Sequence, residues 1–290
     1  MLKSNLFISS IYCDDHKSST FKEYSLSTGD VIIYSLHLPE YSKLTKDLVL
    51  FLNPEERSRS ERYYKEKDRN QFIICRAILK FILAAYTKLE AKSIHFDYHF
   101  NKKPYLSSHP WLCFNISHSE DFAVIAISLN KIGVDIEYLS KDFTFTDLLP
   151  DIFDNNEVLA IQNAENKKHT FYTLWTRKEA LVKGFGKGID DDFKNIPSLD
   201  GDHMIDSKLV KNTENWQVCS FELDDYYLGA IAFEGLANIS KNLVLYSMPN
   251  TMKALIEMAQ PQETLQICYK KFYRFIGSYL NKQMIWILEN

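Results

Sequence analysis

The chain has 290 residues, of which 46% are hydrophobic and 25% charged, a composition that indicates a globular protein with an ample core and excludes a disordered or low-complexity chain. Its net charge of −4 argues against a general nucleic-acid binder. Five scattered cysteines lack the spacing of a zinc site or a disulfide framework, so we interpret them as reduced thiols.

The first residues do not have the pattern of a targeting segment. A short apolar stretch at residues 6–12 is interrupted by Ser9 and Ser10, which makes it too weak for a signal peptide. Elsewhere the sequence has no stretch of ~18 apolar residues that would predict a membrane span. We therefore expect a soluble, cytoplasmic protein without a membrane partner.

The first part of the chain is predicted to form a strand followed by helices. Residues 30–36 are rich in β-branched side chains and follow Gly29, which predicts a strand. Asn53 and Pro54 are typical of a helix start, with a capping side chain and a proline at the first helical position. Residues 68–88 are largely apolar, lack glycine and proline, and are too many for a strand, so they predict a buried helix.

Positive charge gathers around this helix. Residues 54–104 contain 12 Lys and Arg against 7 Asp and Glu, an excess of five positive charges. Lys65, Arg69, Arg76 and Lys80 fall on one narrow angular stripe of the helix. Such cations either extend along the apolar surface to solvent or bind an anionic ligand, and the sequence leaves both interpretations open.

A similar arrangement recurs further along the chain. Strands are predicted at residues 114–118, 122–129 and 131–137, helices at 146–164 and 169–183, and a hairpin at 216–221 and 226–233. Because a helix with antiparallel strands occurs twice, we predict an α+β fold of two similar halves. We expect an N-terminal half at residues 1–129, a C-terminal half at 130–235 and a helical C-terminal extension at 236–290.

Two acidic residues stand out in the predicted strand at 131–137. Asp135 and Glu137 alternate with Val134 and Ile136, so a strand places both carboxylates on one face. Two such carboxylates repel each other unless a cation or solvent separates them. The pattern is common, and by itself it favours an exposed polar edge strand over a cation site.

The predicted helix at 169–183 carries a second pair of charges. Glu179 and Lys183 are four residues apart, beside an apolar stripe that includes Trp175, and alone they indicate a surface salt bridge. The glycines that follow, Gly184 and Gly186, are typical of a helix end. They do not form a P-loop, because they follow a helix and no Ser or Thr comes after the lysine.

Two further segments offer groups for a phosphate. The Lys103-Pro104 step is extended and presents its ammonium rigidly. Ser117 and His118 are predicted at a tight turn, where a hydroxyl, an imidazole and backbone amides could meet an anion. A lone histidine in a turn is more often only a turn residue, and no nucleophile elbow accompanies it to suggest a Ser-His-Asp triad.

Taken together and in this order, the motifs resemble the Sfp-type 4′-phosphopantetheinyl transferases. That family has a Gly-Val/Ile-Asp-Ile-Glu strand and a Trp-x-x-Lys-Glu-Ala-x-x-Lys-x-x-Gly-x-Gly helix, which here stand at residues 133–137 and 175–188. The Lys-Pro-Tyr and Asn-Ile-Ser-His-Ser segments match as well, and the resemblance covers residues 31–233. Lys102 stands where the family usually has glycine, and about 55 C-terminal residues have no counterpart in a minimal member.

The resemblance implies a pseudodimer of the two halves with coenzyme A in the cleft between them, and therefore a monomer. It implies transfer of the 4′-phosphopantetheine moiety of coenzyme A to a serine of an apo acyl or peptidyl carrier protein, giving the holo-carrier and 3′,5′-ADP. Mg²⁺, with Mn²⁺ as an alternative, would be held by Asp135, Glu137 and Glu179 together with the pyrophosphate.

The resemblance also implies roles for individual residues. Asp135, Glu179 and Lys183 form the catalytic set, with Glu179 as general base and Lys183 stabilising or protonating the leaving phosphate. Coenzyme A is expected to contact these residues: Lys67, Arg69, Arg76, Lys103, Pro104, Ser117, His118 and Lys183. Two alternatives remain, a metal-dependent hydrolase of the coenzyme A pyrophosphate and a non-catalytic carrier-binding module.

Overall fold

The computed structural model describes residues 3–10, 17–18, 24–187, 192–206, 215–235 and 243–260. The chain divides into two compact units, one of residues 1–43 and 95–249 and one of residues 44–94 and 250–290. We call them the sheet unit and the helical unit, after their described elements. This mixture of sheets and helices confirms the predicted α+β class.

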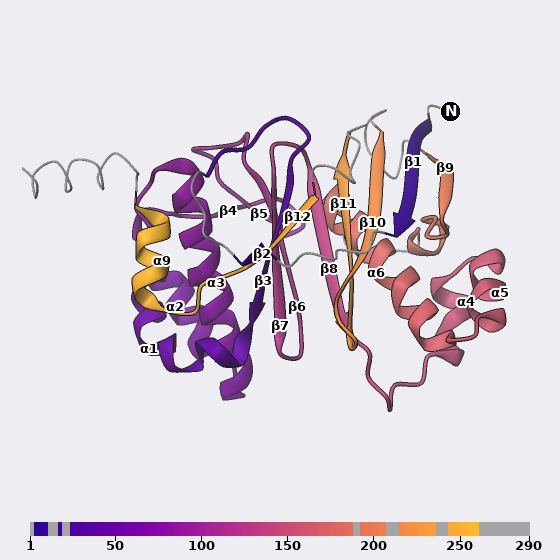
Figure 1. Cartoon of the computed structure of the whole chain (residues 1–290), viewed down its shortest axis with the longest axis horizontal. Coiled ribbons are helices and arrows are strands. Elements are labelled where there is room, and N and C mark those ends of the chain that lie inside the picture. Colours follow the sequence, from indigo (N-terminus) through magenta and orange to yellow (C-terminus); the bar gives the residue numbers. More distant parts are fainter. Residues whose placement is uncertain are drawn as a thin grey trace, which may run out of the picture. The chain divides into compact units, whose positions relative to one another are not determined.

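The sheet unit holds two five-stranded sheets and a two-stranded one (Figure 1). Their strand orders are β8-β11-β10-β1-β9, β2-β12-β3-β7-β6 and β4-β5. The strand bounds are β1 Lys3–Ser10, β2 Lys17–Ser18, β3 Val31–His37, β4 Asp97–Tyr98, β5 Pro104–Tyr105, β6 Cys113–Ser119, β7 Phe122–Ser128, β8 Ile132–Tyr138, β9 Gly201–Asp206, β10 Trp216–Asp224, β11 Tyr227–Glu234 and β12 Leu243–Ser247.

Both large sheets contain the same three-strand pattern. In one, β3 pairs antiparallel with β7 and β7 with β6, and in the other β8 pairs antiparallel with β11 and β11 with β10. A long helix lies in sequence between the first strand and the hairpin each time, namely α3 Glu66–Thr87 and α6 Lys167–Phe185. This repeat confirms the prediction of two similar halves.

The two sheets contribute side chains to one hydrophobic core. Val31 and Val124 from one sheet and Val134 and Ile231 from the other belong to the same buried cluster. The apolar face of β8 is therefore turned inward, as the alternation of Val134 and Ile136 with acidic residues predicts. The sheet unit also contains α4 Leu149–Ile152, α5 Asn155–Asn163 and 3₁₀ turns at Thr146–Leu148 and Phe193–Asn195, with a longer one at Leu38–Leu44 at its border.

The helical unit is built around α3. Its other elements are α1 Thr45–Leu48, α2 Pro54–Glu61, α9 Met252–Ala259 and 3₁₀ turns at Val49–Phe51 and Ala91–Ser93. As predicted, Asn53 caps α2, and Glu56 returns a second capping bond to the Asn53 amide. By length and composition alone α3 could cross a membrane, but 67% of its apolar window is buried within the structure, as in a core helix.

At Lys80 the cation stripe of α3 neither extends to solvent nor binds a ligand, the two roles that the sequence left open. That side chain is fully buried, with Nζ 2.7 Å from Glu56 Oε2, so it does not extend to solvent. The Nε atom of Arg76 lies 3.7 Å from the other oxygen of Glu56. Two of the four cations of the stripe, Arg76 and Lys80, thus lie beside Glu56, because this capping carboxylate of α2 is buried against α3.

The C-terminal extension joins the elements of the first half. Strand β12 pairs parallel with β3, and Met248 continues the contact through its amide to Ser35 O at 3.0 Å. Helix α9 packs on α3 (Figure 1), with Leu255 and Met258 buried. The prediction of a helical extension is therefore wrong for β12, which pairs with the edge that β3 would otherwise leave open. The basic, aromatic residues 270–275 lie outside the described residues.

We expect a chain truncated after Gly235 to be far less stable than one truncated after Gln260. The shorter chain lacks β12 and α9 and with them four side chains that are at most 7% exposed, Leu245, Met248, Leu255 and Met258. Burying one such side chain contributes roughly 1.5–3 kcal/mol, so their joint loss exceeds the stability of many domains. Urea unfolding of the two truncated chains measures the difference, and equal midpoints would contradict a structural role for β12 and α9.

Candidate active site

The site lies where α6 crosses β8, and Gly133 allows that crossing. A Cβ atom at Gly133 would clash with the carbonyl oxygen of Ala180 and the amide of Gly184, and would lie 2.8 Å from the Cα of Gly184. The strand and the helix are therefore in backbone contact. This brings the acidic pair of β8 next to the acidic and basic residues of α6, which the sequence could not place relative to each other.

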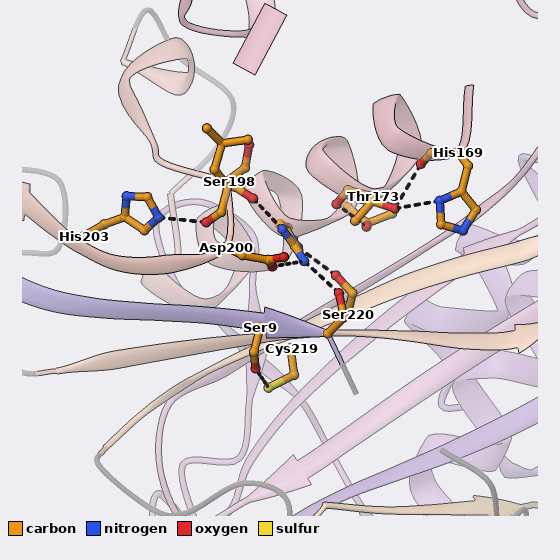
Figure 2. A network of polar contacts seen from close by, with 12 residues as sticks. Ser9, His169, Thr173, Ser198, Asp200, His203, Cys219 and Ser220 are labelled. Atoms are coloured by element: carbon orange, nitrogen blue, oxygen red, sulfur yellow. Dashed lines mark hydrogen bonds and ion pairs between the residues drawn. The ribbon is translucent and has the colours of Figure 1, made fainter. Parts of the chain in front are cut away.

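Arg177 anchors α6 to its surroundings. Its side chain is 3% exposed and donates hydrogen bonds of 2.7 Å to Ser220 Oγ, Ser198 O and Asp200 Oδ1. Figure 2 shows these three partners close together, Ser198 and Asp200 in the loop before β9 and Ser220 on β10. Because the five N–H donors of Arg are fixed in a plane, several such bonds fix the helix in rotation as well as position.

Lys178 provides a second anchor, one residue before Glu179. Its ammonium is fully buried, 2.9 Å from Glu157 Oε2, and donates to Ile196 O at 2.5 Å. Burial lowers the pKa of Lys178, and the Glu157 carboxylate opposes that shift. Two consecutive buried cations thus hold the helical turn that carries Glu179, although no pattern in the sequence predicts that either one is buried.

Asp135 is paired with Lys183. Its side chain is almost fully buried, and Lys183 Nζ lies 2.6 Å from Oδ1. Ser117 Oγ donates to the same Asp135 oxygen at 2.9 Å and accepts from Lys183 Nζ at 3.0 Å. Lys183 thus reaches across to the strand, where the sequence alone favoured a pair with Glu179 on its own helix. The three groups form a closed triangle of charge-assisted hydrogen bonds.

Glu137 is held by hydrogen bonds from two sides. Ser119 Oγ donates to Oε2 at 3.0 Å, and Trp175 provides a second side-chain hydrogen bond. Burial raises the pKa of Glu137, as does the nearby charge of Asp135, while these two hydrogen bonds lower it. Trp175 therefore belongs to the site as well as to the apolar stripe of α6.

Glu179 has an unusual proton affinity for a carboxylate. Its pKa is raised to about 7, mainly by burial and also by repulsion from Asp135 and Glu137, while the charge of Lys183 opposes the shift. A carboxylate with a pKa near the working pH is suited to accept a proton during catalysis. The mutual effects on pKa also show that Asp135, Glu137 and Glu179 share one electrostatic environment.

The donor set fits a divalent cation with a preference for hard oxygen ligands. Asp135 Oδ2 is buried without a hydrogen-bond partner, which leaves its lone pairs unused. Across the part of the chain that the structure describes, no group of three His, Cys, Asp or Glu residues is already gathered closely enough to hold a metal alone. Such a set suits Mg²⁺, which usually completes its shell with substrate phosphates and water.

Lys103 uses its ammonium inside the protein. Its Nζ donates to Lys183 O at 2.7 Å and to Ile132 O at 2.8 Å, and burial lowers its pKa to about 8. The ammonium therefore ties the end of α6 to the start of β8. The role in coenzyme A binding that the resemblance implies for Lys103 stays a prediction, with the aliphatic part of the side chain as the available surface.

A pocket of about 530 Å³ adjoins this lysine. Lys103 and Pro104 line it together with aromatic rings that include Tyr105, Phe114 and Phe185. The preceding residue, Lys102, has a φ of 64°, in the left-handed region that favours glycine. The backbone at this position thus has a conformation suited to the family's usual glycine, even though a lysine occupies it here.

Ser117 and His118 do not face the same way. They belong to β6 rather than to a turn, so their side chains point to opposite sides of the strand. Ser117 is buried against Asp135, whereas His118 is exposed. Sequence reasoning also missed Asn115 and Ser119, although the alternation Asn-x-Ser-x-Ser on a strand indicates a continuous polar face.

Three of the cations that the resemblance implies for coenzyme A binding lie in the helical unit. Lys67 is exposed, and Arg69 is partly exposed with its Nη2 atom 3.8 Å from Glu66 Oε1. Arg76 has a side chain only 10% exposed and lies beside Glu56. Their contact with coenzyme A stays a prediction.

A carboxylate with a pKa near 7 can accept a proton, and a nearby lysine ammonium can stabilise the charge of a phosphate. Together they suit an enzyme that transfers a phosphorylated group. Comparison with known families supports this class. Residues 39–130 match the model of the 4′-phosphopantetheinyl transferase N-terminal domain, and residues 131–232 match that of the 4′-phosphopantetheinyl transferase superfamily.

Individual relatives agree with these matches. The chain is 32% identical over 171 residues to the 4′-phosphopantetheinyl transferase HetI of Nostoc sp., covering 57% of this chain and 72% of the relative. It is 25% identical over 206 residues to the 4′-phosphopantetheinyl transferase Sfp of Bacillus subtilis, covering 69% and 90%. It is 24% identical over 206 residues to the L-aminoadipate-semialdehyde dehydrogenase-phosphopantetheinyl transferase of Xenopus laevis, covering 62% and 68%. The chain belongs to the 4′-phosphopantetheinyl transferase superfamily.

Proposed function

We propose that this protein transfers 4′-phosphopantetheine from coenzyme A to a serine hydroxyl of an apo carrier protein. The observation that carries the proposal is the group of Asp135, Glu137 and Glu179 beside Lys183, in a chain of this superfamily. In the reaction the serine oxygen forms a bond to the β-phosphorus of coenzyme A. The bond from that phosphorus to the bridging oxygen breaks, and 3′,5′-ADP leaves.

Each residue of the group has a role that follows from its surroundings. Glu179 accepts the serine proton, since its pKa of about 7 leaves it in balance between the two protonation states near neutral pH. Lys183 places a positive charge 2.6 Å from Asp135, where it can also stabilise or protonate the leaving phosphate. Asp135 and Glu137 would hold Mg²⁺, or Mn²⁺, together with Glu179, and the bound ion neutralises charge on the pyrophosphate.

The remaining assignments concern binding. The pocket beside Lys103 and Pro104 has the aromatic lining that suits the adenine end of coenzyme A. Ser117 contributes by orienting Lys183, while His118 is exposed and can meet a phosphate directly. Lys67, Arg69 and Arg76 are the candidates for the 3′-phosphate. We further propose that the protein acts as a cytoplasmic monomer and needs neither nucleic acid nor a membrane.

The test is an incubation of the protein with coenzyme A, Mg²⁺ and a panel of apo acyl and peptidyl carrier proteins, analysed by intact mass. We expect at least one carrier to gain a single phosphopantetheine group on serine, and chelation of the metal to stop the reaction. The panel also identifies the preferred carrier.

The same assay separates the two alternatives. A hydrolase would release 3′,5′-ADP from coenzyme A without any carrier, and a binding module would hold a carrier without modifying it. The relatives named above do not favour either alternative, because each is named a transferase. Hydrolysis of coenzyme A with every carrier left unlabelled would refute the proposed transfer.

A further inference from the structure

A strip of polar side chains on β6 contacts the acidic strand β8. Asn115, Ser117 and Ser119 alternate along β6 and therefore lie on one face of it. The side-chain oxygen of Asn115 accepts from the Val134 amide at 2.9 Å, and Ser117 donates to Asp135 at 2.9 Å. Ser119 completes the strip further along β8.

The strip takes the place of backbone pairing. In the described sheets, β6 and β8 are terminal strands, so each lacks a backbone neighbour on one side. The amides of Val134 and Tyr138, which a further strand would otherwise satisfy, are bonded instead by Asn115 and Ser119. The strip therefore fixes the position of β8 relative to β6 at the residues that carry the carboxylates.

Ser119 does more than satisfy an amide. Its hydroxyl accepts from Tyr138 N at 3.0 Å and donates to Glu137 Oε2 at 3.0 Å. A hydroxyl has one hydrogen, and because the amide can only donate, that hydrogen is directed to the carboxylate. Two fixed bonds thus leave the hydroxyl little freedom to rotate, and they restrict the side chain of Glu137 in turn.

We propose that Ser119 is a positioning residue that holds the Glu137 carboxylate in the orientation needed to bind the divalent cation. The inference rests on the proposed function, in which Glu137 is a metal ligand. A group that hydrogen-bonds to a metal-binding carboxylate orients that carboxylate. Removing such a group typically costs 10–100-fold in metal affinity or activity. Ser119 itself is not expected to touch the metal or the substrate.

The test measures Mn²⁺ binding directly, with the full chain and coenzyme A but no carrier, from the loss of the free Mn²⁺ signal in electron paramagnetic resonance. We expect Ser119→Ala to weaken Mn²⁺ binding by about 10–100-fold. Ser119→Thr keeps the hydroxyl and should recover most of the affinity.

Ser128 offers a matched control. Its hydroxyl, on the neighbouring strand β7, donates to Asp30 O at 2.9 Å and accepts from Asn130 N at 3.2 Å. Ser128→Ala therefore removes a similar pair of hydrogen bonds without touching a carboxylate of the site. We expect it to lower stability but to leave the Mn²⁺ affinity unchanged.

The outcomes separate this inference from the proposed function. Wild-type Mn²⁺ affinity in folded Ser119→Ala overturns the positioning role, while carrier modification by the wild-type protein would still stand. Equal weakening in Ser128→Ala would also overturn it, because the effect would then be one of general stability. If Ser119→Ala does not fold, Ser119→Cys preserves the shape with a weaker donor, and unchanged affinity in that variant counts against us.

Discussion

Replacing Glu179 with glutamine is expected to lower the rate of carrier modification by about 10²–10⁴-fold, the usual cost of losing a general base. Glutamine keeps the shape of the side chain and one oxygen that can face a cation, but it cannot accept the serine proton. Because the loss is one of proton transfer, excess Mg²⁺ should not restore the rate.

Asp135→Asn is the matched comparison. Asparagine also keeps the shape of the side chain and one oxygen. Asp135 contacts Lys183 and Ser117, and it does not accept a proton in the proposed reaction. We expect its main effect to be a higher Mg²⁺ requirement, with activity partly recovered at high metal. The rate of both variants is measured against Mg²⁺ concentration. Recovery of Glu179→Gln to near the wild-type rate would show that Glu179 is only a ligand.

The same glutamine variant should be more stable than the wild type at neutral pH without metal. The pKa of Glu179 is raised from 4.5 to about 7, so the folded state retains a proton that the unfolded state releases between these values. The contribution of Glu179 to the free energy of unfolding is therefore complete below pH 4.5 and is lost as the pH rises through about 7. Thermal unfolding should show a gain for Glu179→Gln that grows across this window, on the order of 1–3 kcal/mol at its top.

Gly133→Ala is expected to destabilise the fold by roughly 3 kcal/mol or more, at the upper end of the cost of overpacking. The new methyl group would meet backbone atoms of Ala180 and Gly184, which no change of side-chain rotamer can move. It fits only if α6 separates from β8, so the anchors of α6 and the carboxylate group would be disturbed together. Urea unfolding followed by circular dichroism measures the loss.

Gly229→Ala serves as the comparison for Gly133→Ala. An added Cβ at Gly229 would meet mainly the outer edge of the buried Phe221 ring, a side chain rather than backbone, with Asp135 O at 3.0 Å. We therefore expect a smaller loss of stability. Equal losses in the two variants would contradict the claim that backbone contact between α6 and β8 sets the cost at Gly133.

The local elements followed from local sequence. The cap at Asn53, the apolar run of α3 and the alternation in β8 each depend on neighbours within a few residues, and each was predicted near its observed bounds. Periodicity and capping act over one or two turns, so they can be read from the chain itself. The spacing of the two family motifs identified the three carboxylates and Lys183 by the same local means.

Pairings across elements did not follow in this way. Lys183 had two carboxylates within reach, and the choice of Asp135 over Glu179 depends on how α6 lies on β8. Likewise, Lys103 donates to carbonyls of two distant segments, and a backbone carbonyl leaves no mark in the sequence. A lysine looks the same in the sequence whether its ammonium binds a ligand, a carboxylate or a backbone carbonyl, so its partner cannot be predicted from the sequence alone.

The sequence by itself therefore determined the local elements and the candidate residues of the site, including the strand of Asp135 and Glu137 and the helix of Glu179 and Lys183. Only the tertiary structure decided that Lys80 and Lys178 are buried in ion pairs, that β12 completes the sheet beside β3, and that Ser119 holds Glu137. The physical reason is that hydrogen bonds and ion pairs act over about 3 Å, so their partners are fixed only when distant segments have been packed together.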